Sequence, residues 1–220
     1  MHGRTRTRRW TVTLATTAAL ALAWPAGAGA ATPAAPVERP ALATASATTG
    51  IAQLRGVDYA TWQRDVAQVV AAARPSIERR ISDGSGERLA LVLDIDNTSL
   101  ETDFHPFWTY PTPAVRPVLD LARYAHARGV DVFFVTARPG ILHAPTAYNL
   151  KAVGYPVTGL YVRDLPDLFE EVAAYKTAKR AEIEAKGYTI IANIGNRPTD
   201  MTGGHAERTV KLPDYDGALS

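Results

Sequence analysis

One short segment constrains the fold of this chain more than any other. Residues 89–93 are all Leu, Ala or Val, and they are followed at once by Asp94 and Asp96. A continuous apolar run of this length is typical of a strand that is buried on both faces of a parallel sheet. Such a strand has no packing use for carboxylates at its end, because charge is costly to remove from water without a partner. Ligands bind at the carboxyl ends of strands in open parallel sheets, so the segment indicates a functional site there, with a simple Asx-type turn as the alternative.

The remainder of the chain alternates between strand-like and helical segments. Strand character is found in residues 89–93, 130–135, 159–163, 188–194 and 209–212, and helical spacing in residues 114–128, 146–153 and 175–186. Each of these three helical segments is followed by a glycine, as is common at helix ends. Strands that alternate with helices form a parallel sheet through right-handed crossovers. We therefore expect a Rossmann-like α/β fold with helices on both faces of the sheet.

Helical character also precedes the first strand. Asp58 is placed to cap a helix whose apolar residues between positions 62 and 73 follow helical spacing. Pro75 is expected to open a second helical stretch, which ends in the Gly-rich turn at residues 83–86. The sequence thus predicts two helical stretches that are divided at Pro75.

The first 30 residues predict an export signal. Arg4, Arg6, Arg8 and Arg9 form a positive segment, residues 10–24 are apolar or small, and small residues suited to cleavage follow. The apolar segment is short for a bilayer span, so we expect no stable membrane insertion after cleavage, with an uncleaved anchor as the alternative. Export by the general or the twin-arginine route is left open. The interpretation is a secreted, extracellular protein.

Composition narrows the function classes. The formal net charge is +2, and removing the four arginines of the signal leaves −2. Without the signal the chain has no excess of basic residues, so its charge does not indicate binding to a nucleic-acid polymer. The absence of cysteine excludes disulfides, thiol nucleophiles and thiolate metal sites. Residues 31–50, rich in Ala, Thr and Pro, are predicted to be a flexible linker, and residues 51–220 are long enough for one domain with a full core.

Polar residues follow three of the predicted strands where each apolar run stops. They are Asp94, Asp96 and Thr98 after the first strand, Thr136 and Arg138 after the second, and Asn196 and Asp200 after the fourth. Lys176 opens the helix before the fourth strand. Because the carboxyl ends of parallel strands share one edge of the sheet, we expect these groups to converge.

In these motifs the chain resembles the secreted acid phosphatases of the haloacid dehalogenase (HAD) superfamily, namely the class B and plant vegetative-storage-type proteins of subfamily III. The matching motifs are Asp94-Ile95-Asp96-Asn97-Thr98, Phe134-Val135-Thr136-Ala137-Arg138, and Tyr175-Lys176 with Arg180. The resemblance covers nearly all of residues 58–213 and implies a HAD-like fold without a large cap domain. The last motif departs from the family, which usually has Gly-Asp where this chain has Gly195-Asn196; lipin-type phosphatidate phosphatases look similar there.

The resemblance implies hydrolysis of small phosphate monoesters. Asp94 would attack phosphorus and form an aspartyl-phosphate. Asp96 would protonate the leaving alcohol and then remove a proton from the attacking water, which suits mildly acidic conditions. Thr136 and Lys176 would bind the phosphoryl oxygens.

The resemblance also implies a Mg²⁺ cofactor. Asp94, the backbone carbonyl of Asp96 and Asn196 would hold the ion, and Asp200 would contribute directly or through a water. An amide oxygen carries no charge, so Asn196 is expected to hold Mg²⁺ more weakly than an aspartate would.

Several alternatives stay open. A non-catalytic storage or phosphate-binding protein on the same scaffold and a phosphotransferase are the other candidate functions, and a homo-oligomer is left open. The aromatic residues at 104–110 are expected to pack as a lid over the core, to form a subunit contact, or to form a wall that stacks on an aromatic leaving group such as a nucleobase. Arg138 is expected to contact phosphate or loop backbone, and Arg180 to form an ion pair or support the site. Specificity is expected in the loops at residues 99–112 and 164–174.

Overall fold

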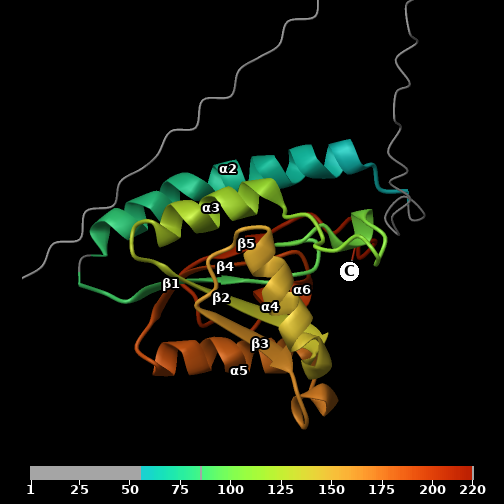
Figure 1. Ribbon diagram of the computed structural model, residues 1–220. Helices are drawn as coiled ribbons and strands as arrows, with labels where there is room; N and C mark the ends of the chain where they lie inside the picture. Colours follow the sequence, from blue (N-terminus) through green and yellow to red (C-terminus); the bar gives the residue numbers. More distant parts are fainter. Residues whose placement is uncertain (1–55, 85, 220) are drawn as a thin grey trace, which may run out of the picture. The chain divides into compact units, whose positions relative to one another are not determined.

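A parallel sheet forms the centre of the protein. The structure is a computed structural model, and it describes residues 56–84 and 86–219. In this part of the chain five strands lie in the order β3-β2-β1-β4-β5, and all are paired in parallel (Figure 1). Their bounds are β1 Leu89–Leu93, β2 Asp131–Pro139, β3 Gly159–Arg163, β4 Thr189–Gly195 and β5 Thr209–Lys211. The expected α/β fold is confirmed, with the first strand at the middle of the sheet.

Helices cover both faces of this sheet. Their bounds are α2 Tyr59–Asp83, α3 Arg116–His126, α4 His143–Ala152, α5 Val172–Ala185 and α6 Pro198–Met201, with 3₁₀ turns η1 Thr102–Phe104, η2 Gly140–Leu142 and η3 Asp167–Phe169. In Figure 1, α2 and α3 run together over one face, and α5 lies on the other.

The central strand is buried because its two faces pack against different helices. Leu91 and Leu93 belong to the core cluster beneath α2 and α3, whereas Val92 belongs to the cluster that includes residues of α5. Burying a side chain of this size contributes about 1.5–3 kcal/mol relative to leaving it in water. This packing explains the uninterrupted apolar run. Because β1 is the central strand, its carboxyl end lies between the carboxyl ends of β2 and β4.

The expected division at Pro75 is wrong, because α2 is one helix that contains this proline. Proline lacks the N–H that would bond to the carbonyl four residues earlier. Ala73 before it and Ile77 after it are buried in the same core cluster, and the Ser76 hydroxyl donates to the Ala73 carbonyl at 2.7 Å. Tertiary packing on both sides therefore keeps the two halves in one helix.

The other predicted elements are all present, with ends that shift by a few residues. Asp58 caps α2, and its Oδ2 accepts a hydrogen bond from the Thr61 amide at 2.7 Å. The strand expected at 130–135 continues to Pro139, which pairs with Arg163 of β3. Among the described helices, none has both the length and the apolar character of a membrane span. The predicted signal and linker lie outside the described residues.

Candidate active site

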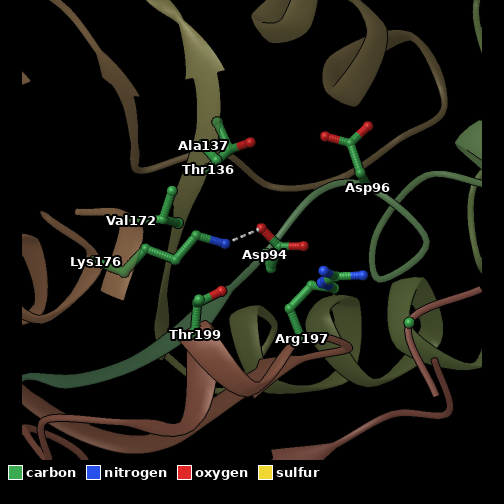
Figure 2. Close-up of a pocket in the computed structure, with 9 residues that line it drawn as sticks. Asp94, Asp96, Thr136, Ala137, Val172, Lys176, Arg197 and Thr199 are labelled. Atoms are coloured by element: carbon green, nitrogen blue, oxygen red, sulfur yellow. Dashed lines mark hydrogen bonds and ion pairs between the residues drawn. The ribbon is translucent and has the colours of Figure 1, made fainter. Parts of the chain in front are cut away.

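A cavity of about 540 Å³ opens where β1 and β2 end (Figure 2). Its lining residues are Asp94, Asp96, Thr136, Ala137, Val172, Lys176, Arg197, Thr199 and Gly217. Four of the six residues predicted for the site, Asp94, Asp96, Thr136 and Lys176, are among them. The other two, Asn196 and Asp200, are buried and hydrogen-bonded to neighbouring motif residues. The structure thus gathers segments that are more than a hundred residues apart in the sequence, as expected where parallel strands end together.

Asp94 belongs to a buried cluster of two carboxylates and one ammonium group. Lys176 Nζ donates to Asp94 Oδ1 at 2.6 Å (Figure 2) and also to Asp200 Oδ1. The three side chains are only 8%, 5% and 2% exposed for Asp94, Lys176 and Asp200. Burial, and next the charge of Asp200, raise the pKa of Asp94, against the effect of Lys176. One cation thus serves two carboxylates, so the ionised cluster has one negative charge in excess and favours a further cation nearby.

Asp96 has a different partner. Its carboxylate accepts two hydrogen bonds from Arg138, at 2.6 Å from Nη2 and 3.0 Å from Nε. Burial opposes the charged form, but the hydrogen bonds and charge of Arg138 outweigh it and lower the pKa of Asp96. Arg138 is itself held by the Thr146 hydroxyl at 3.1 Å. In the structure the Arg138 side chain binds the second carboxylate of the first motif rather than loop backbone, and its contact with phosphate stays a prediction.

Asn196 offers an oxygen donor suited to a hard cation at the carboxyl end of β4. Asn196, the residue after β4, is fully buried, and its Oδ1 accepts a hydrogen bond from Thr98 of the first motif at 3.3 Å. Among the described residues no three His, Cys, Asp or Glu side chains form a metal-binding group. A cation here would therefore be held by at most two carboxylates, with amide, carbonyl and water oxygens. That donor set fits Mg²⁺, which is commonly bound through one or two carboxylates and keeps several waters.

Both carboxylate oxygens of Asp200 are engaged by N–H donors. Oδ1 accepts from Lys176, and Oδ2 accepts from the Arg197 amide at 2.8 Å. The Asp200 carbonyl accepts from Asn193 Nδ2 at 2.6 Å and from Arg180 Nη1 at 3.3 Å. This arrangement ties Asp200 to the orientation of Lys176, and a role of its carboxylate in holding a cation stays a prediction.

Arg180 supports the loop that carries Asp200. Its buried guanidinium donates to the carbonyls of Asp200, Thr202 and Gly204. Of the two roles expected for this arginine, the geometry favours support of the site, since its strong donors hold the backbone of residues 200–204 in place.

The aromatic segment at 104–110 divides into a buried and an exposed part. Phe104 is buried and stacks on Trp62, with ring centroids 4.2 Å apart. Phe107 and Trp108 are 92% and 72% exposed and pack edge-to-face on each other. None of the three lines the cavity. Phe104 therefore serves core packing, and these rings do not form a wall of the cavity.

Sequence reasoning did not single out Arg197, Thr199 and Gly217 as site residues, although all three line the cavity. Arg197 and Thr199 lie within the fourth motif, between Asn196 and Asp200, and their position after a predicted strand was the available signal. Gly217 lies in the C-terminal tail beyond the last strand, where no local pattern marks it.

Comparisons with known proteins place the chain in context. A family model described as HAD superfamily, subfamily IIIB (acid phosphatase) matches residues 30–218. Two soybean (Glycine max) proteins, the stem 28 kDa and stem 31 kDa glycoproteins, are each 36% identical over 90 residues, or 39% of this chain. The matched part spans only 35% and 31% of the length of these relatives.

Solved structures resemble the described domain in fold. The class C acid phosphatase from Bacillus anthracis, and the same protein with tungstate bound, superpose with TM-scores of 0.60 and 0.58. Both are 19% identical and cover 76% of this chain and 86% of their own. At this identity the likeness concerns the fold alone.

Proposed function

The chain belongs to the subfamily IIIB acid phosphatases of the HAD superfamily, and from this premise we propose that it is an exported, Mg²⁺-dependent hydrolase of small phosphate monoesters. The observation that carries the proposal is the placement of the Asp94 carboxylate, at the end of the central strand, in one cavity with Thr136 and Lys176. Export is supported by the composition of residues 1–30.

The first step is attack on phosphorus by Asp94. Phosphate monoesters resist attack because their oxygens are already negative, so a site must position a nucleophile and neutralise charge. The attack forms an aspartyl-phosphate as the bond to the ester oxygen breaks. Lys176, whose Nζ is 2.6 Å from Asp94 Oδ1, and Thr136 line the same cavity as Asp94 and would bind the phosphoryl oxygens.

Asp96 is the proton donor to the leaving oxygen and then the base for the water that hydrolyses the intermediate. Arg138 holds this carboxylate in its ionised form and lowers its pKa. Donation therefore requires Asp96 to leave Arg138 and take up a proton, and acidic conditions favour that form.

Asp94, Asn196 and the backbone carbonyl of Asp96 would hold the Mg²⁺. When bound, the ion neutralises charge on the phosphoryl oxygens and helps to orient the ester. The negative excess of the Asp94–Lys176–Asp200 cluster supports this placement.

An assay with an aryl phosphate tests the proposal. The full chain should release the phenol at acidic pH with Mg²⁺, and EDTA should remove the activity. Asp94→Asn should be inactive, whereas Asp120→Asn, which alters an exposed residue of α3, should retain full activity. Phosphate binding without turnover under any divalent metal would contradict the proposal and favour a phosphate-binding protein. Phosphoryl transfer to added glycerol would identify a phosphotransferase.

A further inference from the structure

Charge pairing in the cavity leaves one cation without a carboxylate. Lys176 is bonded to both Asp94 and Asp200. Arg138 is paired with Asp96. Arg197 also lines the cavity, and among the described residues no carboxylate lies within ion-pair distance of its guanidinium. A phosphate dianion that enters the cavity thus meets a lysine whose charge is already shared, and an arginine whose charge is available.

The position of Arg197 is suited to a substrate that reacts with Asp94. Figure 2 shows Lys176 and Arg197 extending toward Asp94 from different sides. Arg197 is the N-cap residue of α6 and directly follows Asn196, two residues after the end of β4. A phosphoryl group in contact with Asp94 would therefore lie between the two cations.

Two contacts fix Arg197 before any ligand arrives. Its amide donates to Asp200 Oδ2 at 2.8 Å, and its Nη1 donates to the Leu219 carbonyl at 2.8 Å. Leu219 is fully buried, and its amide bonds to the Asp214 carbonyl at 3.0 Å. The C-terminal tail thus orients the guanidinium, which lowers the entropy lost on binding an anion.

We propose that Arg197 binds the phosphoryl group of the substrate, with its planar guanidinium donating to two phosphoryl oxygens opposite Lys176. This inference rests on the proposed function, because it assigns the substrate's phosphoryl group to the same cavity. It adds a substrate-binding residue from the fourth motif to the lysine and threonine that the resemblance implies.

A pair of variants at Gly217 tests the charge of Arg197 without removing the side chain. A Cβ atom at Gly217 would lie 3.7 Å from Arg197 Nη1, so Gly217→Asp introduces a carboxylate close to the guanidinium. Gly217 has a φ of +82°, and Asp and Asn are the side chains that best tolerate this region. Gly217→Asn has nearly the same shape without the charge and is the matched reference.

Binding of inorganic phosphate to the metal-free full chain, measured by calorimetry, is the primary readout, and the KM for an aryl phosphate is the second. Charge-assisted hydrogen bonds of this kind correspond to a change of about tenfold or more in affinity. Arg197→Gln should raise both the Kd for phosphate and the KM by about that factor. Gly217→Asp should raise the same two constants relative to Gly217→Asn. Arg79→Gln, which alters an exposed arginine of α2, should leave both unchanged.

Equal constants for Gly217→Asp and Gly217→Asn would overturn the inference, and so would an unaltered phosphate affinity in folded Arg197→Gln. If Arg197→Gln does not fold, the Gly217 pair decides. Loss of turnover in Asp94→Asn together with unaltered phosphate binding in the Arg197 and Gly217 variants would reject the inference and leave the proposed function standing. Phosphate binding that depends on Arg197 in a protein without turnover would support the inference and reject the proposed function.

Discussion

Asp94 and Asp96 are separated by one residue, yet the two carboxylates lie in opposite surroundings. Asp94 is 8% exposed and shares Lys176 with Asp200, whereas Asp96 is 25% exposed and has Arg138 to itself. Burial raises the pKa of Asp94, and for Asp96 Arg138 outweighs burial and lowers it. Two carboxylates that are close in the sequence thus have pKa values shifted in opposite directions.

The difference follows from the neighbours of the central strand. On the β4 side, α5 supplies Lys176 and the start of α6 supplies Asp200, and both are buried. On the β2 side, the strand continues past the core to Pro139, and this extension brings Arg138 to Asp96. Each carboxylate therefore takes its charged partners from the side of one neighbouring strand. We call Asp94 with Lys176 and Asp200 the β4 half-site, and Asp96 with Arg138 the β2 half-site.

The largest expected effect comes from the β4 half-site. Asp94→Asn removes the proposed nucleophile, so kcat should fall by at least about 10³-fold for aryl and alkyl phosphates alike. Steady-state assays with one substrate of each kind check this. Substantial turnover by the folded variant would show that another group attacks phosphorus.

The effect of a substitution in the β2 half-site should depend on the leaving group of the substrate. Asp96→Asn removes the proposed proton donor, and such a donor typically contributes about 10²–10⁴-fold. We expect a loss in that range for an alkyl phosphate in single-turnover experiments, and a smaller loss for p-nitrophenyl phosphate, whose leaving group needs no proton. Equal losses for both substrates would contradict the role of Asp96 as the acid.

Metal affinity offers a smaller effect. Asn196→Asp adds a charged oxygen beside Asp94, so Mg²⁺ should bind more tightly, by about tenfold, because ligand charge tunes affinity at such sites. The Mg²⁺ concentration for half-maximal activity should fall, and Mg²⁺ should raise the Tm of the variant more than that of the parent. An unchanged Mg²⁺ requirement would place the ion away from Asn196.

The smallest effect concerns stability against pH in EDTA. Because the folded pKa of Asp94 is raised, its stabilising contribution is present below the ordinary carboxyl pKa and is lost as pH rises through the raised value. Because the folded pKa of Asp96 is lowered, its contribution is present above the ordinary pKa and is lost as pH falls through the lowered value.

The Tm of the parent minus that of Asp94→Asn should therefore fall with rising pH, and the same difference for Asp96→Asn should fall with decreasing pH. Differences of a few degrees are expected, since about 1 kcal/mol shifts the Tm of a domain this size by about 2–4 °C. Parallel slopes would contradict the two environments.

Local patterns predicted those parts of the fold in which local signals and packing agree. The strands at 89–93 and 159–163 were predicted with the bounds observed, because short apolar runs between turn residues are local signals. The division at Pro75 was wrong because a core that both halves of α2 share outweighs the local preference of proline.

The candidate site was predictable to a similar extent. Residues at strand ends converge because topology requires it, so Asp94 and Thr136 were found from position alone. The pairing of Asp96 with Arg138, 42 residues away, and the support of Arg197 by Leu219 are tertiary contacts. No spacing in the chain encodes such contacts, so structure is needed to find them.

The most direct test of the account is to trap the phosphorylated protein. Asp96→Asn should form the intermediate from p-nitrophenyl phosphate and hydrolyse it slowly, because the base for water is missing. Mass spectrometry of the acid-quenched reaction should then show one added phosphoryl group, on the peptide that carries Asp94, with a matching burst of nitrophenol. A phosphoryl group on another residue, or a burst without any protein adduct, would contradict the claim that Asp94 is the nucleophile.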